Sequence, residues 1–79
     1  MLNKANTLKT LSLNASAVET RRIELGLTKQ ELARRAGITP GRYTQMINDA
    51  MDGKPAFAPT AKEIGAVLGL TIEALFVET

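Results

Sequence analysis

The polar side chains between residues 39 and 48 have the types and spacing needed to bind a partner through hydrogen bonds. Gln45 carries an amide that donates and accepts at once, and Arg42 carries five N–H donors in a planar fork. Thr44 adds a hydroxyl and a methyl group between them. Groups of this kind form paired hydrogen bonds with base edges or phosphate oxygens, and they break no covalent bond.

The residue types that most catalytic and metal sites need are missing. The 79 residues include no cysteine and no histidine. Their absence removes disulfides, thiolate and imidazole metal ligands, cysteine nucleophiles and the commonest general base. No convergent set of nucleophile, base and metal ligand stands out, so an enzyme is the poorest of the functional alternatives. We expect no enzymatic activity, no metal, no cofactor and no small-molecule ligand.

Charge is distributed unevenly along the chain. Residues 1–42 contain eight basic and three acidic side chains, a net charge of +5, whereas residues 43–79 contain two basic and five acidic ones, a net charge of −3. A basic half raises the expectation of a polyanionic partner. A basic face that is merely solvated would give the same pattern, so charge alone leaves both readings open.

Local capping signals place the polar residues on the second of two short helices. Thr28 and Glu31 have the spacing of a capping box, which begins a helix. Gly37 suits the positive φ that commonly follows a helix end. Thr39 can cap the next helix, and Pro40 suits its first turn because its ring already has a helical φ. We predict helices at about residues 28–36 and 39–48.

Two helices joined this closely predict a helix-turn-helix motif, whose second helix can enter the major groove of DNA. The small Ala33 lets the two helices cross closely, and Ile38, Tyr43 and Met46 hold the second helix on the core. The opposite face of that helix is polar. Its residues are Gly41, Arg42, Thr44, Gln45 and Asn48.

Composition favours short packed helices over a β-sandwich, because aromatic residues make up only 4% of the chain and hydrophobic residues 44%. Capping residues and glycines like those described above predict three further helices. We predict a helix from Ser16, with Glu19 in its capping box, to Gly26; a helix from Thr60, with Glu63, to Gly69; and a last helix from Thr71 that carries Ile72, Leu75 and Phe76.

The remaining segments are predicted to be an arm and a loop. Residues 1–13 have spaced leucines and no strong cap, so we expect an N-terminal arm followed by one domain over residues 14–79. Polar residues interrupt the leucines of the arm, which excludes the continuous apolar segment of a signal peptide. Residues 49–59 are rich in Asp, Gly and Pro and predict a loop, with Phe57 as an anchor over the core.

The sequence resembles the lambda-repressor-like helix-turn-helix proteins, the Cro/CI or XRE group of transcriptional regulators. The matching stretches are RRIELGLTKQELARRAGIT (21–39), YTQMIN (43–48) and LGLTIEALF (68–76). The resemblance spans residues 18–76. It implies an all-α, compact five-helix fold and a non-enzymatic regulator. It also implies a homodimer that binds double-stranded operator DNA and represses transcription, as phage or plasmid repressors do. Because no signal peptide is predicted, we expect the protein to be cytoplasmic.

The resemblance also implies DNA-contacting positions. The base-reading side maps onto Pro40, Gly41, Thr44 and Gln45, with Arg42 beside them. Pro40 and Gly41 depart from relatives with polar side chains there, so specificity depends more on Gln45, Arg42 and DNA shape. We expect Arg34 and Arg35 to point away from DNA. The expected phosphate contacts are Lys29, Thr28, Thr39, Asn48 and Lys54.

A protein-interaction module on the same fold is the alternative function. The leucines between residues 2 and 13 would form its docking segment, as in an antitoxin or another partner-binding protein. The helix at residues 39–48 carries little charge on its outer face, which is compatible with a protein partner. No stretch is long and apolar enough for a membrane span, so we expect no membrane partner.

Overall fold

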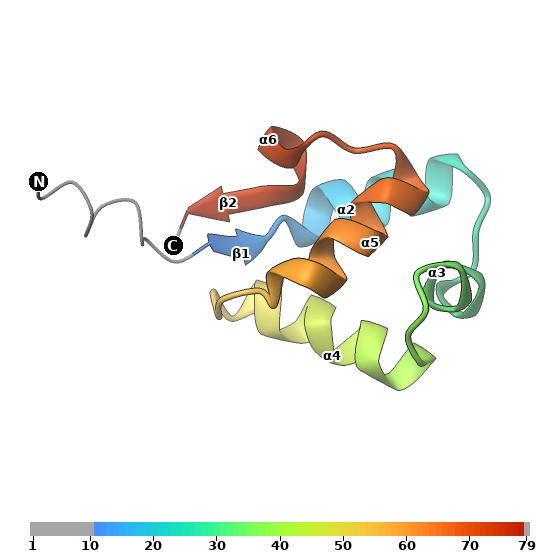
Figure 1. The fold of residues 1–79 in the computed structure, drawn as a ribbon, viewed down its shortest axis with the longest axis horizontal. Helices are drawn as coiled ribbons and strands as arrows, with labels where there is room; N and C mark the ends of the chain where they lie inside the picture. Colours follow the sequence, from blue (N-terminus) through green and yellow to red (C-terminus); the bar gives the residue numbers. More distant parts are fainter. Residues whose placement is uncertain (1–10, 79) are drawn as a thin grey trace, which may run out of the picture.

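The computed structural model describes residues 11–78, which form five helices and two short strands. Figure 1 shows α5 in the middle of the molecule and α4 along one outer edge. The predicted all-α, five-helix fold is confirmed, with a small strand pair added to it. The elements are β1 (Leu11–Leu13), α2 (Ala15–Glu24), α3 (Lys29–Arg35), α4 (Pro40–Met51), α5 (Ala58–Leu68), α6 (Ile72–Leu75) and β2 (Phe76–Glu78).

Capping interactions begin α3 and α4 where the sequence predicts. The Thr28 hydroxyl accepts a hydrogen bond from the Glu31 amide at 3.0 Å, and the Glu31 carboxylate accepts one from the Thr28 amide at 2.8 Å. This is a complete capping box. Thr39 accepts from the Arg42 amide at 3.1 Å, and Pro40 occupies the first helical position. Both helix starts are therefore stabilised by their own local sequence.

The turn between α3 and α4 is a compact, hydrogen-bonded structure. Gly37 has φ +78°, and its amide donates to the Arg34 carbonyl at 3.1 Å. The Ile38 amide donates to the Ala33 carbonyl at 2.9 Å. These two bonds are the Schellman arrangement, in which glycine takes the left-handed conformation at little cost. The turn thus fixes the direction in which α4 leaves α3.

Two other helices begin at residues that differ from the prediction. α2 is capped by Asn14, whose side-chain oxygen accepts from the Ala17 amide at 3.1 Å, and not by Ser16. The Asn14 amide is bound to the Leu75 carbonyl at 2.7 Å, and this long-range bond holds Asn14 at the helix start. α5 begins after Phe57 with no side-chain cap, and not at Thr60. A proline in its first turn favours the earlier start.

The strand pair corrects two predictions. Residues 11–13, predicted as part of the arm, form β1, and Phe76, predicted in the last helix, begins β2. The strands are antiparallel, with Leu13 opposite Phe76 and Leu11 opposite Glu78. Leu13 is only 2% exposed, so burial of this side chain is what orders β1. Residues 1–10 of the predicted arm lie outside the described residues.

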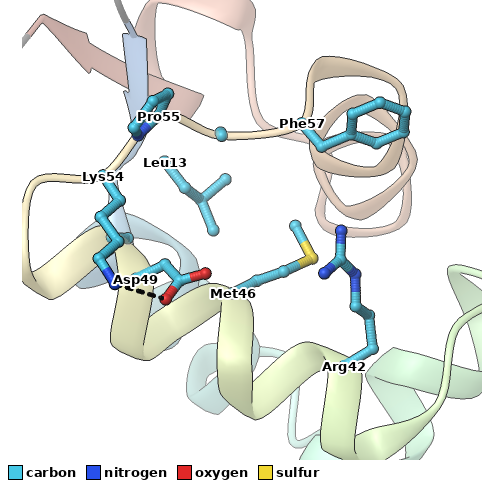
Figure 2. Close-up of a pocket in the computed structure, with 9 residues that line it drawn as sticks. Leu13, Arg42, Met46, Asp49, Lys54, Pro55 and Phe57 are labelled. Atoms are coloured by element: carbon cyan, nitrogen blue, oxygen red, sulfur yellow. Dashed lines mark ion pairs between the residues drawn. The ribbon is translucent and has the colours of Figure 1, made fainter.

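The loop before α5 is also arranged differently from the prediction. α4 continues to Met51, three residues beyond its predicted end. Phe57 is 60% exposed and does not anchor the loop. Leu13 lies beneath this loop (Figure 2), and two hydrogen bonds join the loop to β1. The Ser12 hydroxyl donates to the Lys54 carbonyl at 2.7 Å, and the Ala56 amide donates to the Leu11 carbonyl at 2.9 Å.

One hydrophobic core joins all five helices. α5 packs against α2, α3 and α6, and α4 packs against α3. Gly65 of α5 faces Leu75 of α6 so closely that a Cβ atom on Gly65 would lie 2.8 Å from a Leu75 methyl carbon. No helix within residues 11–78 has the length and hydropathy needed to cross a membrane. The largest fully buried side chains are Tyr43, Leu32, Ile64, Leu68, Leu75, Val18 and Ser12.

Candidate nucleic-acid interface

α3 and α4 form the helix-turn-helix unit that the sequence predicts. In Figure 1, α3 is viewed nearly end-on while α4 runs across the picture, so the two axes cross at a large angle. Only residues 36–39 separate the two helices. α4 contacts α2, α3 and β1 on its inner side, which leaves its outer side open along the edge of the molecule. This geometry presents a free helix surface to a partner.

The inner side of α4 is apolar and fixes the rotation of the helix. Tyr43 is completely buried and Met46 is 7% exposed. Ile47 and Ala50 are partly buried against the same core. With 3.6 residues per turn, these positions form one continuous stripe. The polar residues between them must therefore face outward.

The outward side of α4 is a row of neutral polar groups. Gly41, Gln45 and Asn48 follow each other at spacings of four and three residues, which places them in line along the exposed surface. Thr44 borders this row on one side and Arg42 on the other. Asn48, which the sequence assigns to phosphate contact, lies in the same row as Gln45.

Every residue predicted to contact DNA is exposed. The ten positions are Pro40, Gly41, Arg42, Thr44, Gln45, Lys29, Thr28, Thr39, Asn48 and Lys54. Thr39 is the N-cap of α4, Thr28 and Lys29 stand at the start of α3, and Lys54 lies beyond the C-terminal end of α4. The Thr28 and Thr39 hydroxyl oxygens accept capping bonds, which leaves each O–H free to donate. The candidate phosphate contacts therefore come from the start of α3, from positions before and after α4 and, at Asn48, from the exposed side of α4.

Comparison with protein families decides the classification. A family model described as Helix-turn-helix matches residues 18–75, which run from within α2 to the end of α6. The chain belongs to this Cro/CI, XRE-type helix-turn-helix family. No curated protein and no solved structure matches the chain. The family consists of DNA-binding regulatory domains and not of enzymes, and the chain is a DNA-binding transcriptional regulator of the XRE type.

In this helix-turn-helix regulator, Arg42 lies apart from the exposed row formed by Gly41, Gln45 and Asn48. It lines a small pocket of about 80 Å³ between α4 and the loop before α5. Figure 2 shows its side chain rising on the same side of α4 as Met46 and well apart from Asp49. The Asp49 carboxylate lies 3.9 Å from the Lys54 ammonium group. The structure thus groups Gln45 with Gly41, Thr44 and Asn48, and it places Arg42 on the flank.

A partly buried polar cluster holds α4 of the regulator against α2. The Tyr43 hydroxyl donates a hydrogen bond to the Glu19 carboxylate in α2. Glu19 also pairs with Arg22 at 2.8 Å, and Arg22 donates to the Leu27 carbonyl at 2.7 Å. Burial, followed by the bond to Glu19, raises the pKa of Tyr43, and the bond from Arg22 lowers the pKa of Glu19.

The sequence patterns described above did not reveal this cluster of Glu19, Arg22 and Tyr43. Arg22 pairs with Glu19, three residues earlier in the same helix, α2. Arg21 donates to the Leu68 carbonyl in α5 at 2.9 Å and pairs with Glu24 at 3.3 Å. An acidic residue and a tyrosine 24 positions apart give no local signal. Only the packing of α2 against α4 brings them together.

Proposed function

We propose that this regulator binds double-stranded operator DNA sequence-specifically, with α4 in the major groove, and represses transcription as a homodimer. The row formed by Gly41, Gln45 and Asn48 supports this proposal because it is exposed, polar and rotationally fixed by the buried Tyr43. An α-helix fits the major groove, where base edges present distinct patterns of donors and acceptors. A neutral polar surface suits such edges.

Each position on α4 has a role under this proposal. The Gln45 amide forms a bidentate pair with adenine, a contact that gives about 1–3 kcal/mol of discrimination. Thr44 contacts a thymine methyl group or a phosphate. Arg42 reaches from the flank of α4 to a guanine or a phosphate. Pro40 and Gly41 have no side-chain donor, so they permit close approach of the backbone.

Phosphate contacts around α4 would set the register of the protein on DNA. Basic and hydroxyl groups at both ends of a recognition helix bind the strands that border the groove. These contacts carry no sequence information, so they contribute to affinity on any duplex. The proposed residues are Lys29, Thr28, Thr39, Asn48 and Lys54.

A homodimer follows from the geometry of the target. One α4 spans only a few base pairs, and two subunits related by a two-fold axis read half-sites about 34 Å apart. Sedimentation of the pure protein, with and without operator DNA, measures this directly. A single subunit per duplex at saturation would contradict the dimer.

The decisive experiment is a selection from a pool of random duplexes followed by fluorescence anisotropy titrations. The wild-type chain is expected to prefer the selected duplex over a mixed-sequence duplex. Gln45→Ala should reduce this preference by about 1–3 kcal/mol. Thr20→Ala changes an exposed polar residue of α2, outside the helix-turn-helix, and this matched control should leave the preference unaltered. Equal binding of both duplexes by the wild type would contradict the proposal.

One observation favours the second candidate function, a protein-interaction module. Large apolar side chains are exposed at the strand pair and α6, including Leu11, Ile72 and Val77. Leu11 and Ile72 line a groove of about 450 Å³ that the proposed DNA contacts do not use. The same titrations separate the two functions. A module that binds only protein would show weak, sequence-independent DNA binding that Gln45→Ala leaves unaltered.

A further inference from the structure

An open depression lies between α3 and the N-terminal end of α4. Its volume is about 500 Å³, and it is bordered by residues of both helices and of the turn. Gln30 and Arg34 come from α3, four residues apart and so on one side of that helix. Thr39 and Pro40 are the cap and first residue of α4, and Ile38 forms the floor toward the core.

The turn fixes the position of Arg34 relative to α4. The Arg34 carbonyl accepts the bond from Gly37, and the neighbouring Ala33 carbonyl accepts the bond from Ile38. Ala33 itself is completely buried. The backbone that carries Arg34 is therefore held by the same Schellman turn that directs α4. The side chain emerges beside the end of α4 that the proposed function places in the groove.

The charge of Arg34 is available to a ligand. Arg34 is exposed, and within residues 11–78 it forms no ion pair. The acid one turn earlier, Glu31, is bound to the Thr28 amide. That bond is the main cause of the lowered pKa of Glu31, and the positive charges of Arg34 and Arg35 lower it further without forming an ion pair. Arg35 is equally exposed, but it does not border the depression.

We propose that Arg34 contacts a backbone phosphate of the DNA strand that borders the start of α4. The proposal rests on the function proposed above and replaces the expectation that Arg34 points away from DNA. The first two residues of α4, Pro40 and Gly41, have no side-chain donor. Arg34 supplies the missing donor at this end from the preceding helix. As a phosphate contact, it adds affinity for any sequence.

The experiment compares Arg34→Gln with Arg35→Gln. The two variants remove the same charge from adjacent residues of α3, and only Arg34 borders the depression. Dissociation constants are measured by anisotropy over a series of salt concentrations, on the selected duplex and on a mixed-sequence duplex. Circular dichroism melts establish that both variants fold. Arg34→Lys, which keeps the charge, tests whether a cation at this position is sufficient.

In a plot of log K against the logarithm of the salt concentration, we expect Arg34→Gln to reduce the steepness of the slope by about 0.9. This is the value for one phosphate contact. At 0.1 M salt, the variant should then bind both duplexes roughly eightfold more weakly than the wild type. The affinities of the two proteins should become equal as the salt concentration approaches 1 M. Arg35→Gln should keep the wild-type slope, and Arg34→Lys should keep most of it.

Three outcomes would overturn the assignment. Equal slopes for Arg34→Gln and the wild type would show that no phosphate is contacted. Equal losses for Arg34→Gln and Arg35→Gln would show a general charge effect. A loss on the selected duplex alone would indicate a base contact. If Gln45→Ala still reduces sequence preference, these results reject only the role of Arg34, whereas a chain that binds neither duplex rejects both proposals.

Discussion

Tyr43 of α4 donates a hydrogen bond from its hydroxyl group to the Glu19 carboxylate of α2, and this bond connects the two helices. Arg22 completes the cluster by binding Glu19 and the Leu27 carbonyl. Because Tyr43 is fully buried, its ring also fills the core beneath α4. Tyr43 therefore contributes both to the packing of α4 and to its orientation on the domain.

Tyr43→Phe should lower the free energy of unfolding by about 1.5–3 kcal/mol, the range for a hydrogen bond to a charged group. The ring remains, so the loss reports on the hydroxyl alone. Urea denaturation measures it, and a double-mutant cycle with Glu19→Gln isolates the pair. Additive losses in that cycle would show that the two groups do not interact.

Stability should fall as the pH drops into the acid range. The pKa of Glu19 lies below its ordinary value of 4.5, mainly because Arg22 binds the carboxylate. The ionised form is therefore favoured in the folded state, and its contribution is present above pH 4.5 and lost as the pH falls through the folded pKa. The pKa of Glu31 is lowered in the same direction by its capping bond.

Thermal melts of the wild type between pH 7 and 3 measure this effect. Glu19→Gln and Glu31→Gln should each reduce the fall in melting temperature between pH 7 and 3, and the double variant should reduce it more. A wild-type melting temperature that stays constant over this range would exclude the linkage.

Gly65→Ala should destabilise the domain by about 1–3 kcal/mol, as overpacking does. The added methyl group would lie 2.8 Å from a methyl carbon of Leu75, which is only 1% exposed and has little room to move. Gly41→Ala is the matched control within a helix, because nothing lies within 4 Å of its added methyl group. That variant should lack the steric penalty and leave stability unchanged or slightly higher, because alanine loses less backbone entropy than glycine on folding. Equal effects of the two substitutions in urea denaturation would contradict the close packing of α5 and α6.

Gly37→Ala should cost about 1–2 kcal/mol through backbone strain alone. Gly37 has φ +78°, and no atom lies within 4 Å of an added Cβ, so steric contact does not contribute. Gly37→Asn should cost less, since asparagine adopts the left-handed conformation more readily. Urea denaturation of the three proteins checks this order. A larger loss for asparagine than for alanine would mean that side-chain volume, and not φ, determines the effect.

The features that could be predicted from sequence are those written within a few consecutive residues. Thr28 with Glu31, the turn at Gly37 and the cap at Thr39 each act through bonds spanning five residues or fewer. The apolar stripe through Tyr43 and Met46 follows from helical periodicity alone. These signals were sufficient to place α3, the turn and the start of α4.

The features that were missed depend on contacts between distant residues. Leu13 is ordered as β1 because its opposite strand begins at Phe76, and no local pattern marks this pairing. Asn14 caps α2 in a position held by Leu75. The location of Arg34 beside Pro40 depends on how two helices cross and not on the period of either one. Sequence periodicity gives the faces of each helix, and only tertiary packing decides what those faces border.

The antiparallel pairing of Leu11 with Glu78 brings the first and last described residues to neighbouring positions. A short peptide bridge between them would need only the length of a hairpin loop, about two to five residues. A circularly permuted chain, opened elsewhere on the surface, should therefore retain the same packing. Covalent closure at this point would also stabilise the domain by restricting its unfolded ensemble.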